Sequence, residues 1–242
     1  MNWVIINQPK TFPPQAEHPM DLEIINQPKV FPRRARYQIT KRVMDMGLCL
    51  LILPLVLPLM ILFAVVIYLD SPGPVFFVQE RIGKGGRLFR MYKFRTMQPK
   101  FDDSYHRAFM KAFVNGQVVN ENGKRVYKPI QPSQVTWFGR ILRKTSLDEL
   151  PQLINVLKGE MSLVGPRPNV PWEVEEYQLW HHERLEVLPG ITGLAQVRGR
   201  SGIPFDRIVQ CDVEYFEKRS LALDIKILWW TAGSVLGGRG AG

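Results

Sequence analysis

The longest apolar pattern in the chain is an uncharged run from Leu48 to Leu69. A membrane-spanning helix needs about 20 apolar residues, and the run reaches that length. Pro54 and Pro58 lie in its interior. Proline lacks a backbone N–H and clashes with the carbonyl four residues earlier, so it kinks a helix. The pattern therefore predicts a membrane helix that bends near the two prolines.

Basic residues flank this run on both sides. They are Arg33, Arg34, Arg36, Lys41 and Arg42 before it, and Arg81, Lys84, Arg87, Arg90, Lys93 and Arg95 after it. Lys and Arg concentrate on the cytoplasmic side of membrane helices, so a crossing helix would place one cluster on the wrong side. A re-entrant helix that returns to the same face removes the conflict. The alternative is a kinked single-pass helix, because the run has no Ser or Thr to satisfy the carbonyls that its prolines free.

Shorter patterns after the run predict an α/β domain. "DSPGPVFF" at Asp70–Phe77 ends the helix, and residues 74–83 and 86–97 read as strands around a Gly85–Gly86 turn. Residues 98–135 are polar and predict a surface loop or hairpin. A helical pattern begins at Thr136.

Further helices are expected toward the C-terminus. Apolar spacing predicts one over Leu150–Lys158 that stops at Gly159, and others over residues 173–188, 206–219 and 221–236. Residues 192–200 read as a strand. The last helix carries Trp229 and Trp230, which suit either a membrane interface or a packed core.

The first 36 residues form a polar, proline-rich extension. "IINQPKTFP" at Ile5–Pro13 returns as "IINQPKVFP" at Ile24–Pro32. Two copies are too few for a solenoid, so we expect an extended or weakly ordered tail. The chain thus divides into an extension over 1–36, a membrane helix over 37–70 and a domain over 71–242.

Charge and cysteine content narrow the class of partner. The chain has 32 Lys and Arg against 22 Asp and Glu, a formal net charge of +10. This balance suits nucleic acid, anionic lipid or a phosphate-bearing substrate. Cys49 and Cys211 have no zinc or disulfide spacing, which favours a reducing cytosol. The basic residues are interleaved with acidic ones rather than gathered in one stripe, which argues against a non-enzymatic nucleic-acid-binding or membrane-binding module.

Asp148 and Glu149 are the acidic residues most open to a chemical role. One explanation is helix capping, because Ser146 and Glu149 form the S-x-x-E pattern of a capping box. With Ser146 as the cap, Pro151 falls where the helix needs a backbone N–H, which weakens the capping explanation. With Asp148 as the cap, Pro151 falls where no intrahelical donor is lost. Alternatively, two carboxylates can hold Mg²⁺, or one can attack phosphorus.

Capping alone is a sufficient explanation on local sequence, and the chemical alternative rests on cations near the acid pair. Arg143, Lys144 and Arg167 could bind phosphate oxygens, so acid, metal and arginine together would suit phosphoryl transfer. Lys93 and Arg95 alternate on a predicted strand and would share one face. Arg198 and Arg200 are likewise two apart, and either pair could be merely an exposed basic strand.

Other chemistry finds little support in the sequence. His181 and His182 have no metal-ligand spacing such as H-E-x-x-H, so we expect surface histidines. The chain has neither G-x-G-x-x-G nor a P-loop, and turn chemistry explains "RIGKGGRLF".

Three long stretches resemble one bacterial family. "QERIGKGGRLFRMYKFRTM", "GRILRKTSLDELPQLINVLKGEMSLVGPRP" and "LPGITGLAQVRGR" follow the basic-flanked apolar segment in the order found in the monotopic polyprenyl-phosphate phosphoglycosyl transferases. These bacterial sugar transferases start exopolysaccharide and glycoconjugate assembly. The resemblance covers about residues 38–236. It leaves the N-terminal repeat unmatched, and the loop from Gln98 to Val135 departs from the family pattern.

The resemblance implies a reaction and roles for the acid pair. A nucleotide sugar, usually UDP-linked, gives its phosphosugar to polyprenyl phosphate and releases UMP. Asp148 would be the nucleophile that takes the phosphosugar covalently, and Glu149, beside it, would help hold Mg²⁺. Phosphates would meet cations of the matching stretches, namely Lys93, Arg95, Arg143, Arg167, Arg198 and Arg200.

The resemblance also implies a location. The apolar helix would be a re-entrant hairpin, and residues 71–242 would be a compact catalytic domain with amphipathic interfacial helices, resting on membrane lipids at the cytoplasmic face of the bacterial inner membrane. No nucleic-acid partner is expected, and a homo-oligomer stays open. The rival is a single-pass, glycosyltransferase-like membrane enzyme without a covalent intermediate.

Overall fold

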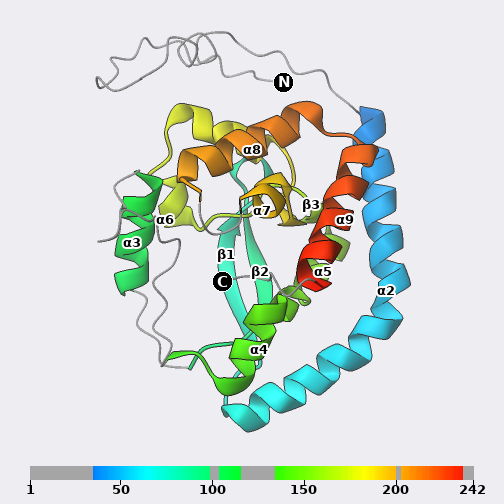
Figure 1. The fold of residues 1–242 in the computed structure, drawn as a ribbon, viewed down its shortest axis with the longest axis vertical. Helices are drawn as coiled ribbons and strands as arrows, with labels where there is room; N and C mark the ends of the chain where they lie inside the picture. Colours follow the sequence, from blue (N-terminus) through cyan, green and yellow to red (C-terminus); the bar gives the residue numbers. More distant parts are fainter. Residues whose placement is uncertain (1–34, 99–103, 116–133, 200–202, 237–242) are drawn as a thin grey trace. The chain divides into compact units, whose positions relative to one another are not determined.

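The computed structural model describes residues 35–98, 104–115, 134–199 and 203–236. These residues form helices and two small two-stranded sheets, which agrees with the predicted α/β class (Figure 1). The N-terminal repeat, most of the predicted loop over 98–135 and the candidate phosphate ligand Arg200 lie outside the described residues.

The apolar run belongs to one continuous helix, α2 (Ala35–Asp70). Within the described ranges it is the one helix long and apolar enough to cross a membrane. Pro54 and Pro58 both lie inside it, and its direction changes between the blue N-terminal half and the cyan C-terminal half (Figure 1). The bent helix was predicted. Two separate helices forming a hairpin are not seen in this part of the chain.

The two ends of α2 contact the same domain. Near its start, Lys41 pairs with Asp224 at 3.1 Å, and Arg42 donates to the carbonyl of Leu157 at 2.9 Å. Near its end, the Phe63 ring lies edge-on to Phe94 at 6.1 Å between centroids. Between these contacts the middle of the helix exposes large apolar side chains to the surroundings, namely Leu50, Leu51, Ile52, Leu55, Leu57, Leu59, Ile61 and Leu62.

The first sheet is the predicted hairpin. Strands β1 (Phe76–Ile82) and β2 (Leu88–Phe94) pair antiparallel, with Phe76 opposite Phe94. A short 3-10 turn, η1 (Lys84–Gly86), joins them, and the positive φ values of Gly85 (66°) and Gly86 (77°) explain the glycines.

The side chain of Asn155 forms hydrogen bonds with the backbone of β2. It accepts from the Tyr92 N–H at 3.1 Å and donates to the Arg90 carbonyl at 2.7 Å. Asn155 lies on α5 (Gln152–Lys158), which begins and ends close to the predicted bounds, with Gly159 in the left-handed conformation at its end. The sheet is therefore tied directly to the helix that follows the acid pair.

The second sheet is parallel and small. Strand β3 (Ser162–Val164) pairs with β4 (Gly190–Thr192). The strand predicted over 192–200 is wrong, because β4 stops at Thr192 and helix α7 (Leu194–Arg198) follows. Gly193 separates the two, and a Cβ there would lie 2.3 Å from the Gly165 carbonyl oxygen. This close backbone approach, which the alternation of residues does not reveal, ends the strand.

The remaining helices agree with the sequence in part. Those found near their predicted bounds are α4 (Trp137–Thr145), α8 (Phe205–Lys218) and α9 (Leu221–Leu236). Within the loop predicted over 98–135, residues Ser104–Val114 form helix α3.

The helix predicted over 173–188 is wrong. A short α6 (Pro171–Val174) is followed by η4 (Leu179–Glu186), a 3-10 helix. Between them Gln178 is extended, and its N–H donates to the His181 ring at 3.2 Å. That local hydrogen bond competes with a continuous α-helix.

Candidate active site

The acid pair lies in a short 3-10 helix, η3 (Leu147–Glu149), between α4 and α5. Leu142 of α4 and Val156 of α5 are both 0% exposed, so the segment lies between two helices that are anchored in the core. Ser146 precedes the pair with φ 58°, the one non-glycine residue with positive φ among those described. Its backbone N–H donates to the Arg143 carbonyl at 3.2 Å and ends α4.

Both capping explanations of the pair are wrong. The Ser146 side chain makes no capping hydrogen bond, and α5 begins only after Pro151. Ser146 has the left-handed conformation of a helix C-cap, where its hydroxyl is not aimed at a following turn. Asp148 and Glu149 are thus not engaged in capping α5, which leaves their carboxylates for other interactions.

Glu149 is held by two cations from distant parts of the chain. Its Oε1 accepts from Lys93 Nζ at 2.7 Å and from Arg167 Nη1 at 3.1 Å. The Lys93 and Glu149 side chains are only 13% and 15% exposed. Burial alone would raise the pKa of Glu149, but the charges of Lys93 and Arg167 outweigh it and hold that pKa well below its usual range. Glu149 is therefore an anionic anchor for two cations, with a pKa lowered by their charges.

Asp148 has a different environment from its neighbour. Burial raises its pKa, the Glu149 charge adds to the rise, and the charges of Lys93, Arg143 and Arg167 oppose it. No hydrogen bond joins its carboxylate to the residues that the structure describes. Two adjacent carboxylates thus have pKa values displaced in opposite directions, a pattern that marks functional sites.

Arg143 adds an incompletely satisfied cation. Its Nη1 is buried and has no hydrogen-bond partner among the described residues. Burial lowers the pKa of Arg143, and the Asp148 charge opposes that shift. A buried donor without a partner is costly, and an anionic ligand would relieve that cost. Lys144, the next residue, is exposed.

Lys93 and Arg95 do not act as one pair. Lys93 lies on β2 and reaches Glu149, whereas Arg95 follows the end of the strand and is 7% exposed. The Arg95 guanidinium donates to the Ser71 carbonyl. Because β2 ends at Phe94, the alternation that would align the two side chains does not extend to Arg95. Its Nε and Nη1 are buried without a hydrogen-bond partner in the described part.

The structure does not bring Arg198 to the acid pair. Arg198 ends α7 and pairs with Glu214 of α8, its Nη2 donating to Oε1 at 3.1 Å. The Cys211 thiol of the same helix also interacts with Arg198, and burial raises the pKa of that thiol, which keeps it neutral. Arg198 is therefore satisfied elsewhere.

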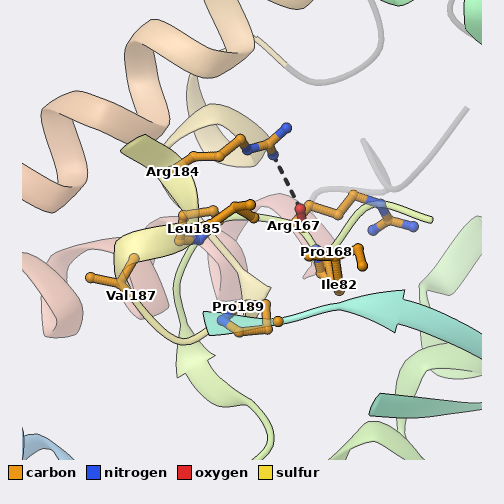
Figure 2. A pocket seen from close by; sticks show the side chains of 9 residues that line it. Ile82, Arg167, Pro168, Arg184, Leu185, Val187 and Pro189 are labelled. Atoms are coloured by element: carbon orange, nitrogen blue, oxygen red, sulfur yellow. Dashed lines mark hydrogen bonds between the residues drawn. The ribbon is translucent and has the colours of Figure 1, made fainter. Parts of the chain in front are cut away.

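A short loop presents Arg167. The backbone carbonyls of residues 166–169 all accept hydrogen bonds, from Gly190 N, Arg184 Nη2, Arg81 Nη1 and Ile82 N respectively. Figure 2 shows the Arg184 guanidinium pointing to the Arg167 carbonyl, while the Arg167 guanidinium extends away from the pocket. That pocket is lined on one side by Pro166, Arg167 and Pro168.

The two histidines lie in different environments. His182 is exposed as predicted, but His181 is 0% exposed, so the expectation of a surface side chain is wrong for it. The His181 ring packs edge-on against Trp180 and Phe205 at 4.3 and 5.2 Å between centroids. Neither histidine contacts the acid pair, and no sequence pattern marks His181 as a core residue.

The oxygen donors of the pair suit a divalent cation. Glu149 Oε1 is occupied by the two cations, which leaves Glu149 Oε2 and the Asp148 carboxylate. No cluster of three or more His, Cys, Asp or Glu that could hold a metal occurs among the residues described. Mg²⁺ is commonly held by one or two carboxylates and completed by water and substrate phosphates, so the site fits an ion that arrives with a phosphate ligand.

Comparison with known proteins identifies the family. A family model described as bacterial sugar transferase matches residues 36–238. The chain therefore belongs to the bacterial sugar transferase family, as its motifs predict.

Several curated relatives are similar to the chain. It is 44% identical over 170 residues to the galactosyl transferase CpsE of Streptococcus agalactiae, covering 70% of this chain and 36% of that protein. It is 40% identical over 201 residues to the undecaprenyl-phosphate galactose phosphotransferase of Salmonella typhimurium, covering 83% and 41%. It is 36% identical over 203 residues to the exopolysaccharide production protein ExoY of Sinorhizobium fredii, covering 84% and 88%. The chain thus spans well under half of the first two relatives and most of the third.

Proposed function

We propose that this protein transfers a phosphosugar from a nucleoside diphosphate sugar to polyprenyl phosphate, as an early membrane step of exopolysaccharide or glycoconjugate synthesis. The donor would be a UDP-sugar, and the products UMP and a polyprenyl diphosphate sugar. The observation that carries the proposal is the setting of Asp148, a partly buried carboxylate without a hydrogen-bond partner in the described part, beside the cluster of Lys93, Glu149 and Arg167. The relatives that act on undecaprenyl phosphate support the choice of acceptor.

The proposed reaction has two displacements at phosphorus. An Asp148 carboxylate oxygen forms a bond to the sugar-bearing phosphorus, and the bond from that phosphorus to the bridging oxygen breaks, so UMP leaves with the electron pair. An oxygen of polyprenyl phosphate then attacks the same phosphorus and displaces the Asp148 carboxylate. Phosphoryl transfer depends mainly on positioning and charge neutralisation, which cations around a poised carboxylate supply.

Each charged neighbour has a distinct proposed role. Glu149 would anchor Lys93 and Arg167 so that both face the phosphates, because its Oε1 accepts from each of them. Arg143, whose buried Nη1 has no hydrogen-bond partner among the described residues, would bind a phosphate oxygen. Asp148 and Glu149 Oε2 would hold Mg²⁺, which neutralises diphosphate charge when bound. Arg95 and Arg198 remain candidate phosphate ligands with less support, since they bond Ser71 and Glu214 rather than the acid pair. Arg200, outside the described residues, stays a candidate from the motif alone.

We further propose that α2 is re-entrant and that the domain rests on the cytoplasmic face. A straight helix of 36 residues would be about 54 Å long and would carry its ends apart. Instead Lys41 at one end and Phe63 near the other contact one domain, while most of the large apolar side chains in the middle of the helix are exposed. A bent helix that dips into one leaflet fits these contacts, and it keeps both basic flanks on one side.

The rival is a membrane glycosyltransferase-like enzyme without a covalent intermediate. The direct test of activity is UMP release from a panel of nucleotide sugars, with polyprenyl phosphate and Mg²⁺. We expect release with at least one UDP-sugar, and loss of release in Asp148→Asn and Glu149→Gln. If both variants retain wild-type turnover, the site is elsewhere and the proposal fails.

A further inference from the structure

We propose that Arg184 is a positioning residue for transfer: held by Asp212, it fixes the loop over residues 165–169 so that Arg167 meets Glu149. This inference rests on the proposed function and adds to it two residues that lie behind the loop. It starts from the structure of the loop itself.

The loop cannot organise itself through its own amides. Pro166 and Pro168 lack a backbone N–H, so two of its donors are missing. Its carbonyls depend on donors from outside, and two of the four are guanidinium groups rather than backbone amides. The Arg167 carbonyl in particular accepts from Arg184 Nη2 at 3.1 Å (Figure 2).

Arg184 is itself held rigidly. It is 2% exposed, and its Nη2 lies 2.6 Å from Asp212 Oδ2 of α8, a carboxylate that is also 2% exposed. Its Nη1 donates to the Tyr177 hydroxyl at 3.0 Å. Burial raises the pKa of Asp212 to about 6, against the opposing charge of Arg184, so Asp212 is ionised at neutral pH.

The geometry links this pair to the active site in two steps. The Arg184 guanidinium bonds the backbone of Arg167, and the Arg167 side chain bonds Glu149 Oε1 at 3.1 Å. A buried ion pair is weak evidence of net stabilisation, since apolar replacements often match it. The Arg184–Asp212 pair also donates to the loop that carries Arg167, which gives its charges a role other than stabilisation. Lys in place of Arg184 would keep the charge but lose the planar fork that reaches several acceptors.

The test is a double-mutant cycle on kcat/KM for transfer, with Arg184→Lys, Arg167→Ala and the double variant. We expect Arg184→Lys alone to lower kcat/KM at least about tenfold, because small misplacements of charged groups are costly. In the Arg167→Ala background it should have less than about a twofold effect, since residues that act through one another are not additive. Losses that multiply in the double variant, or full activity of folded Arg184→Lys, would overturn the inference.

Two further measurements keep the test decisive. Hydrogen–deuterium exchange of the peptide over residues 163–170 should be faster in Arg184→Lys and in Asp212→Asn, the second variant if the first fails to fold. Arg219→Lys is the matched control, a buried arginine whose guanidinium bonds the Phe216 carbonyl and should leave that exchange unchanged. Unchanged exchange in both test variants contradicts the inference even if no donor supports transfer, whereas absence of transfer by the wild type contradicts only the proposed function.

Discussion

Lys93 and Glu149 form a 2.7 Å ion pair although 56 positions separate them in the sequence. Lys93 comes from the second strand of a hairpin and Glu149 from the turn between α4 and α5. Burial lowers the pKa of Lys93 and the Glu149 charge opposes that shift, so the pair depends on both members. The ion pair joins the sheet to the segment that carries Asp148.

Replacing Lys93 by Met should lower kcat/KM for transfer and shift its pH dependence. We expect kcat/KM to fall by about 100-fold or more, as for loss of a charged group facing the reacting phosphate. Of the charges that lower the pKa of Asp148, that of Lys93 is the largest. Its removal therefore raises that pKa further, and the acidic limb of the kcat/KM profile should move to higher pH, because the proposed attack by Asp148 requires an ionised carboxylate.

The matched control for that variant is Arg90→Met, which removes an exposed cation from the same strand. We expect its activity to stay within about twofold of the wild type, since exposed charges away from a site contribute little. An acidic limb that moves to lower pH in Lys93→Met would show that Asp148 is not the group being titrated.

The left-handed conformation of Ser146 predicts that two substitutions at this position have different effects on stability. Glycine adopts positive φ freely, so Ser146→Gly should leave the free energy of unfolding unchanged or raise it by up to about 1 kcal/mol. Ser146→Val should lower it by about 1–2 kcal/mol or more. Denaturation in detergent measures both. Lys144→Gly, at an exposed helical position nearby, is the control and should lower the free energy of unfolding by about 1 kcal/mol. Equal losses in Lys144→Gly and Ser146→Gly would argue against the left-handed conformation of Ser146.

Gly165 should not tolerate a side chain. A Cβ at this position would lie 2.3 Å from the Leu188 carbonyl oxygen and 2.9 Å from the Gly190 nitrogen. We expect Gly165→Ala to lower the melting temperature, with a loss of about 1–3 kcal/mol, and to reduce transfer because the Arg167 loop must move. At Gly233 of α9 an added Cβ would have no other described residue within 4 Å, so Gly233→Ala should be neutral or stabilising. A Gly165→Ala protein as stable and active as the wild type would exclude this tight packing.

The sequence predicted the local elements of the site better than the contacts between those elements. Helical spacing and Gly159 indicated α5, and the glycine pair indicated the β1–β2 turn. The partnership of Lys93 with Glu149 could not be predicted, because local periodicity gives the face of a side chain and not its long-range partner. The capping pattern at Ser146 misled because an S-x-x-E match does not report backbone conformation, and Ser146 has positive φ.

The predictions that failed share a physical cause. The strand expected over 192–200 and the helix expected over 173–188 are both interrupted where backbones or rings pack closely, at Gly193 and His181. Both contacts override local propensity, although the approach at Gly193 is tertiary and the hydrogen bond from Gln178 to His181 is local. Arg184 and Asp212 were not predicted as part of the site for the same reason, since each lies on an ordinary amphipathic pattern and only the fold brings them behind Arg167.

Re-entrance of α2 predicts that both of its ends lie on one side of the membrane. Single cysteines at Gln38 and Pro72, both exposed, can be introduced after Cys49→Ala and Cys211→Ser. In spheroplasts an impermeant maleimide should label neither, and lysis should expose both. Pro54→Leu with Pro58→Leu should straighten the helix and increase external labelling at Gln38→Cys. External labelling at Gln38→Cys with both prolines present would establish a single-pass helix instead.

The covalent role of Asp148 is tested most directly by mass spectrometry of the enzyme mixed with a UDP-sugar donor and Mg²⁺ in the absence of acceptor. The predicted result is a peptide containing Asp148 that gains the mass of the sugar phosphate, with an equal amount of UMP released. The adduct should disappear on addition of polyprenyl phosphate and should not form in Asp148→Asn. Turnover with the acceptor, but no adduct at any quench time or an adduct that persists in Asp148→Asn, would contradict nucleophilic attack by Asp148.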